Sequence, residues 1–226
     1  MTERPIIFSA SMIRALIAGS KSQTRRIVKP QPEGRAWHPK AGSSVIGADL
    51  GDLLNKMPEY CRHGAAGQRL WVREKWSADP PIDDSWASTE WNGCGRKVRE
   101  IPERFHHPRF CNYAADWLHE PIRWTPSIHM PRWASRILLE IVEVRVERLQ
   151  DISEADAIAE GITTIWPDGP RPDKGPNHYT IMIDSVSYNA PTAREAYAQL
   201  WEMINGEGSW DANPFVWTIS FRRIAP

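Results

Sequence analysis

The fold class is indicated most clearly by residues 137–149, which read ILLEIVEVRVERL. Apolar side chains alternate with other residues through Ile137–Ile141, which is typical of a β-strand with one buried face. The alternation then continues one residue out of phase through Val142–Val146. Because a β-bulge produces such a change of phase, we expect one long strand that bends in its middle.

Further strands and a few short helices are expected on either side of this segment. Strand patterns occur at Pro5–Phe8, Arg69–Trp76 and Phe215–Phe221, the last half-buried, and Thr24–Lys29 is a basic strand or turn. Helices are expected from Ser9 to Gly19, from Ser153 to Glu160 before Gly161, and from Thr192 to Ile204 with apolar Ala196, Tyr197, Leu200, Trp201 and Ile204 on one face. No series of βαβ units is present, which disfavours a doubly wound dinucleotide-binding fold. The pattern favours an α+β fold built on a small β-barrel with short flanking helices.

Three long stretches interrupt these elements. Residues 30–66 are rich in Pro, Gly and Ser and have little periodicity, so we expect a long loop there. Residues 77–123 have the composition of an insertion, and residues 163–190 form another Pro- and Gly-rich stretch. We therefore expect a single domain over residues 1–226, with insertions at about these three places.

The composition excludes several classes of protein. The 28 basic and 28 acidic side chains cancel, which excludes a histone-like protein that coats nucleic acid by bulk charge. No apolar run approaches the roughly 18 residues of a membrane-spanning helix, and residues 1–5 lack the order of a secretion signal. Three cysteines argue against a disulfide framework and for a reducing cytoplasm. The 12 tryptophans are several times the usual number for this length.

The charge is balanced overall but not locally. Residues 1–40 are mainly basic, and residues 140–160 are mainly acidic. This asymmetry predicts either a basic face that binds anions or two segments that pair with each other in the fold.

One candidate site is the turn Gly19–Arg26, at the end of the first expected helix. Lys21 and Thr24 converge only if the residues between them are not a regular strand. A lysine with a lowered pKa can then deprotonate the threonine hydroxyl and make it a nucleophile. The alternative is a solvated basic turn.

A second candidate is Glu160, in the last turn of the acidic helix. A carboxylate is electrostatically disfavoured at a helix C-terminus, so a function or a nearby cation would explain its place there. The alternative is an ordinary surface carboxylate.

A third candidate is the segment Trp124–Arg136, which holds two indoles, a histidine and two arginines between prolines. Aromatic rings and arginines together are typical of proteins that stack and read unpaired bases. The segment Trp71–Trp76, which contains Arg73 and Glu74, raises the same question. In both segments the tryptophans are alternatively core residues.

Cysteine and histidine residues form a fourth group: Cys61, His63, Cys94, His106, His107, Cys111 and His119. Their spacing matches no zinc finger, so buried thiols and exposed histidines are favoured over a zinc site. We expect no metal and no cofactor.

Together these motifs resemble the ASCH family of PUA-like proteins. The resemblance lies in the order Gly19-x-Lys21-x-x-Thr24-x-Arg26, then Gly67-x-x-Leu70-x-Val72, then a strand, the helix from Ser153 to Glu160, and a final strand. The segments Trp71–Glu74 and Ser127–Trp133 make the chain similar to the longer ASCH-like proteins of bacteriophages and prophages. The similar segments cover about half of the chain.

The resemblance implies a PUA-like small β-barrel whose cleft binds RNA, nucleotides or modified bases. A small bacterial member removes the acetyl group from N4-acetylcytidine with a lysine, a threonine and a glutamate. Carried over to this chain, Lys21 is the base, Thr24 the nucleophile, and Glu160 orients the lysine or the base amine. The substrate- or nucleic-acid-binding residues implied are Arg25, Arg26, Trp71, Arg73, Glu74, His129, Arg132 and Trp133.

Two other functions remain open from the sequence: a non-catalytic reader of modified or single-stranded nucleic acid, and a phage accessory protein with nuclease activity. The partner expected is a nucleoside or a single-stranded nucleic acid, RNA rather than DNA, and no membrane. We expect a monomer located in the cytoplasm, which is the bacterial host's if a phage encodes it.

Overall fold

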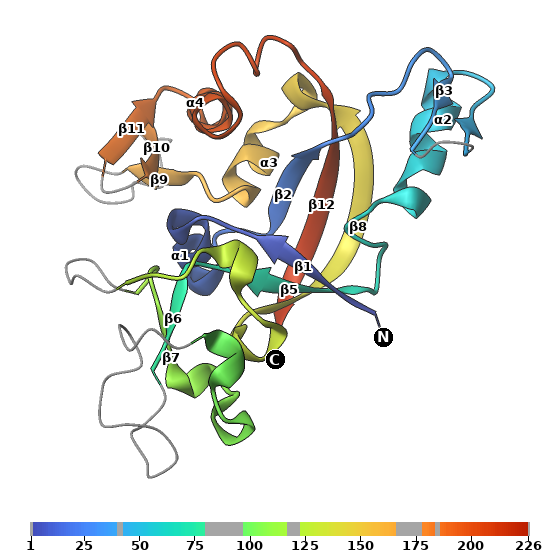
Figure 1. Cartoon of the computed structure of the whole chain (residues 1–226). Helices are drawn as coiled ribbons and strands as arrows, with labels where there is room; N and C mark the ends of the chain where they lie inside the picture. Colours follow the sequence, from blue (N-terminus) through green and yellow to red (C-terminus); the bar gives the residue numbers. More distant parts are fainter. Residues whose placement is uncertain are drawn as a thin grey trace.

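A curved five-stranded sheet forms the centre of the computed structural model, which describes residues 2–39, 43–79, 97–116, 123–165, 178–183 and 186–225 (Figure 1). The strand order is β1 (Glu3–Ile7), β5 (Arg69–Arg73), β8 (Leu138–Arg148), β12 (Phe215–Ile224) and β2 (Gln23–Ile27). β1 and β5 are parallel, and the other neighbours are antiparallel. The fold is therefore α+β as predicted, but β1 and β2 lie at opposite ends of the strand order, so the sheet is open and not a closed barrel.

The predicted bend in the long strand is confirmed by the pairing of β8 with β12. Ser220 pairs with Glu143 and Phe221 with Ile141, so Val142 has no partner in this ladder. Val142 is 56% exposed, whereas Ile141 is buried. The extra residue lets β8 curve with β12 around the core (Figure 1).

The helices begin and end close to the predicted residues. α1 (Ala10–Ala18) is capped by Ser9, whose hydroxyl accepts from the Met12 amide, and it ends at Gly19 with φ 78°. α3 (Glu154–Ala159) starts after Ser153, and α4 (Ala193–Asn205) starts after Thr192, each with the same kind of cap. Among the described residues, no helix is long and apolar enough to cross a membrane.

Residues 30–66 are not the plain loop that was expected. They contain β3 (Ala36–Trp37), β4 (Val45–Ile46), α2 (Leu50–Lys56) and the 3-10 helix η1 (Met57–Tyr60). Trp37, Leu53 and Met57 are buried in the same core as the main sheet. These elements are too short to show periodicity, and contacts with the core hold them.

The other two stretches also carry secondary structure where they are described. β6 (Trp76–Ala78) pairs with β7 (Cys111–Tyr113), and β10 (His178–Ile183) lies between β9 (Thr163–Ile165) and β11 (Val186–Ala190). Six further 3-10 helices occur in the described residues: η2 (Val98–Glu100), η3 (Glu103–Phe105), η4 (Pro108–Phe110), η5 (Ser127–His129), η6 (Arg132–Ala134) and η7 (Leu149–Asp151).

Two predicted strands differ from the structure. The strand expected over Arg69–Trp76 divides into β5 and β6, and between them the buried carboxylate of Glu74 accepts from Arg136 at 2.9 and 3.0 Å. β12 was expected to be half-buried, but its first half is buried on both faces. Phe215 and Trp217 belong to the main core, and Val216 packs in a second core with α4.

Candidate functional site

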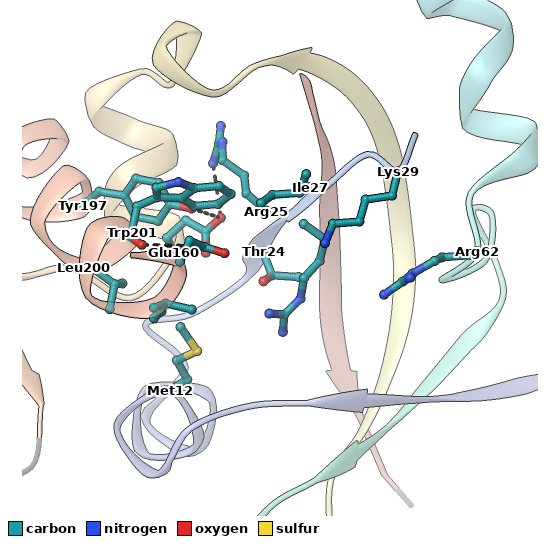
Figure 2. A pocket seen from close by; sticks show the side chains of 13 residues that line it. Met12, Thr24, Arg25, Ile27, Lys29, Arg62, Glu160, Tyr197, Leu200 and Trp201 are labelled. Atoms are coloured by element: carbon teal, nitrogen blue, oxygen red, sulfur yellow. Dashed lines mark hydrogen bonds and ion pairs between the residues drawn. The ribbon is translucent and has the colours of Figure 1, made fainter. Parts of the chain in front are cut away.

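A cavity of about 220 Å³ lies beside β2, between α1 and α4 (Figure 2). Its wall combines a basic side, an acidic group and apolar rings. The lining residues are Met12, Thr24, Arg25, Arg26, Ile27, Lys29, Arg62, Glu160, Tyr197, Leu200, Trp201, Ile204 and Asn205.

Lys21 and Glu160 form a buried ion pair behind this cavity. The ammonium group donates to Glu160 Oε2 at 2.8 Å and to the Glu160 carbonyl at 2.7 Å, and the two side chains are 0% and 2% exposed. Burial lowers the pKa of Lys21 below its ordinary value, against the attraction of Glu160. The contact that the family resemblance implied is therefore present, and it explains why a carboxylate lies at this helix end.

Gly161 is needed for this contact. It has a φ of 99°, and a Cβ at this position would lie 3.1 Å from the Ala15 Cβ and 3.4 Å from the Lys21 Cβ. Glycine therefore lets the chain turn away from α3 while Glu160 stays against Lys21.

Thr24, the remaining member of the predicted catalytic set, lies in the wall of the same cavity as Glu160. Its side chain is buried, and its residue pairs with Ile219 of β12. In the described part of the chain, no hydrogen bond joins its hydroxyl to Lys21, whose ammonium is held by Glu160. The structure therefore brings Lys21 and Glu160 into contact and places Thr24 in the wall of the same cavity as Glu160.

Arg25 connects the basic turn to the acidic segment. Its fully buried guanidinium lies 2.6 Å from Glu147, 3.4 Å from Asp156 and 3.4 Å from Glu160. Part of the local charge asymmetry is thus explained by pairing between the two segments. Arg26, however, lines the cavity and donates to the carbonyl of Ile7 at 2.7 Å.

Tyr197 and Trp201 of α4 give the cavity an aromatic wall (Figure 2). The Tyr197 hydroxyl donates to Glu160 Oε1 at 3.5 Å. Burial, and then the negative charge of Glu160, raise the pKa of Tyr197 well above its ordinary value, so the phenol stays protonated at neutral pH.

The remaining predicted binding residues do not line this cavity: Trp71, Arg73, Glu74, His129, Arg132 and Trp133. The Arg73 guanidinium lies 4.6 Å from the ring centre of the buried Trp71. Arg132 donates to Glu3 at 2.6 Å, and His129 is exposed. Trp133 stacks on His106 at 4.6 Å and 4° between the ring planes. Their role in binding stays a prediction.

Among the described residues, no three His, Cys, Asp or Glu side chains form a group suited to a metal ion. Cys61 is buried and Cys111 is half-buried, while Cys94 and His119 lie outside the described residues.

Sequence reasoning missed four residues of the site that the argument uses: Lys29, Arg62, Tyr197 and Trp201. Lys29 follows the end of β2, and Arg62 lies in the stretch 30–66 that was expected to be a loop. No local sequence pattern marks either residue. Tyr197 and Trp201 were assigned to the apolar face of α4, and that face borders both the core and the cavity. Comparisons of the chain with family models, with curated proteins and with solved structures found no match.

Proposed function

We propose that the cavity beside β2 binds the base of a nucleoside or nucleotide. The observation that carries the proposal is the convergence of the Glu160 carboxylate, the Tyr197 and Trp201 rings and basic side chains on one space of about 220 Å³. A space of this size accommodates a single planar base. Carboxylates accept hydrogen bonds from exocyclic amines such as N4 of cytosine, and aromatic side chains pack against bases.

Glu160 retains capacity to accept from a ligand. Its two oxygens offer about four acceptor positions. Among the described residues, its side chain accepts from Lys21 at 2.8 Å, from Arg25 at 3.4 Å and from Tyr197 at 3.5 Å. One position therefore remains for the amine of a base.

We also propose that the fold is related to the ASCH-type, PUA-like barrel, with the sheet left open between β1 and β2. In support, the Gly19–Thr24 turn and the α3 helix meet through Lys21 and Glu160, as the resemblance implies for a shared cleft. The wider proposal is a nucleic-acid-binding protein of the kind found in phages, acting on a nucleoside or on single-stranded RNA.

A variant that fills the cavity tests base binding. Ile204 lines the cavity but is 52% exposed, so Ile204→Trp adds bulk to the cavity without disturbing the core. In calorimetric titrations with cytidine, N4-acetylcytidine and adenosine, we expect the wild type to bind at least one ligand. The variant is expected to bind it at least about tenfold more weakly, a loss of ~1.4 kcal/mol.

Met203→Trp is the matched control. Met203 is the preceding residue of α4, is 45% exposed and lines a different hollow, with Tyr188 and Trp210. This variant should bind like the wild type. Equal binding by all three proteins, or binding by none, would refute the proposed site.

A second candidate function is removal of an N4-acyl group from cytidine. It is favoured by the lowered pKa of Lys21 and by Thr24 in the wall of the same cavity. Once Lys21 has lost a proton to solvent, its amine would accept the proton of Thr24 Oγ1 as this oxygen attacks the acyl carbon, with Arg26 near the resulting oxyanion. The C–N4 bond would then break as Lys21 returns the proton to N4, and water would hydrolyse the acyl-threonine. The step requires Lys21 to exchange one Glu160 oxygen for Thr24.

Thr24→Ala tests this reaction. With N4-acetylcytidine as substrate and cytidine release followed by chromatography, we expect kcat/KM to fall by about 10³-fold or more, because the nucleophile is lost. Thr24→Ser keeps a hydroxyl and should retain most activity. If the wild type releases no cytidine, the hydrolase proposal fails, while base binding is judged by the titrations above.

A further inference from the structure

Three cationic side chains line the cavity without a carboxylate partner. Arg26, Lys29 and Arg62 all contribute to its wall. Within the described ranges, none of the three lies within 4.0 Å of an acidic side chain, whereas Lys21 and Arg25 are both paired. Figure 2 shows Lys29 and Arg62 extending toward Thr24 from the side opposite Glu160.

Glu160 already has two cationic partners. Its carboxylate is already in contact with Lys21 at 2.8 Å and with Arg25 at 3.4 Å. Both of these cations are fully buried, so the charge of Glu160 is balanced within the protein. The side of the cavity at Arg26, Lys29 and Arg62 therefore keeps an excess of positive charge.

The neighbourhood of Arg62 adds to this excess. Arg62 Nε lies 3.4 Å from His63 Nε2, and Arg4 donates to the carbonyl of Cys61. Burial, followed by repulsion from Arg62, Arg26 and Arg4, lowers the pKa of His63 to about 4. His63 is then neutral at pH 7, as expected where several cations crowd together.

We propose that Arg26, Lys29 and Arg62 form a phosphate subsite, so that the cavity takes a nucleotide in preference to a free nucleoside. The inference rests on the proposed base site and adds a second group to its ligand. A base near Glu160 would direct its sugar toward the three cations. A phosphate monoester carries about −1.5 to −2 charges and matches guanidinium and ammonium donors. Arg62 and Lys29 are exposed, so the phosphate keeps part of its hydration.

The test compares nucleosides with ligands that also carry a phosphate group. Cytidine, adenosine, their 5′-monophosphates, the dinucleotide CpC and inorganic phosphate are titrated by calorimetry into the full chain at two salt concentrations. We expect a monophosphate or the dinucleotide to bind at least 10-fold more tightly than its nucleoside, and this advantage to shrink at high salt. If the monophosphate binds more tightly than CpC, the phosphate recognised is a monoester. If CpC binds more tightly, it is the phosphodiester backbone of a polymer.

Arg62→Gln assigns the effect to the subsite. It should bring the affinity for the nucleotide close to that for the nucleoside, so that the advantage of at least 10-fold is lost. Arg223→Gln, an exposed arginine at the opposite end of β12 that does not line the cavity, should change neither. Equal binding of nucleoside and nucleotide would overturn the phosphate subsite and leave the base site standing. Binding of inorganic phosphate with no preference for any base would support the subsite and overturn the base site. Binding of no ligand would overturn both.

Discussion

Glu160→Gln is expected to lower the free energy of unfolding by about 3–5 kcal/mol at pH 7. The substitution keeps the shape of the side chain and removes its charge. Lys21, with 0% exposure and Glu160 as its partner at 2.8 Å, then becomes a buried cation without a counter-charge. Urea denaturation followed by circular dichroism measures the loss.

The same variant has an expected pH dependence. Burial already lowers the pKa of Lys21 from 10.5, and losing Glu160 removes the attraction that opposes this shift. Between the folded pKa and 10.5 the unfolded chain binds more protons, so the variant gains stability as the pH rises through this window. Its deficit relative to wild type should therefore shrink in alkaline solution.

Glu143→Gln is the control for Glu160→Gln, because it removes the same charge from an exposed ion pair. Glu143 accepts from Arg145 at 2.9 Å, but the two side chains are 52% and 39% exposed. We expect a loss below about 1 kcal/mol. Equal stability of Glu160→Gln and Glu143→Gln would contradict the buried ion pair.

Trp37→Ala is expected to cost about 3–5 kcal/mol of unfolding free energy. Trp37 belongs to the stretch 30–66, yet it is only 2% exposed and packs edge-on against Trp217 of β12 at 5.5 Å. Its indole also donates to the carbonyl of Pro30 at 2.8 Å. The variant would leave this carbonyl without its donor. The loss would show that this stretch is part of the core and not a removable insertion.

Ile46→Ala is the comparison within the same stretch. Ile46 pairs with Ala36 in the β3–β4 ladder but is 58% exposed, so its loss should stay within about 0.5 kcal/mol. A cost below 1 kcal/mol for Trp37→Ala in urea denaturation would mean that residues 30–66 are peripheral to the fold.

The central elements were predictable because their signals are local. The change of phase at Val142 located the bulge, and Ser9, Ser153 and Thr192 marked the helix starts because each cap satisfies nearby amides. The open sheet was not predictable, because it depends on pairing between distant strands. The short elements of residues 30–66 were not predictable either, because contacts with the main core hold them. The break between β5 and β6 at Glu74 was likewise not marked by a local pattern.

The candidate site also combines residues that the sequence could indicate with residues that it could not. The pairing of Lys21 with Glu160 was implied by the resemblance and is present in the structure. Arg62 could not be assigned from the sequence, because only the packing of η1 and the residues that follow it brings its side chain to the cavity. Tyr197 has the spacing of a core residue, and the period of α4 cannot distinguish a side chain that faces the core from one that faces a cavity.

A crystal structure of the protein with cytidine 5′-monophosphate tests the central claim most directly. We predict that the base occupies the cavity beside β2, with its N4 amine within hydrogen-bond distance of Glu160 and its phosphate on Arg26, Lys29 and Arg62. A nucleotide bound at Trp71 or Trp133, with the cavity beside β2 empty, would contradict the account.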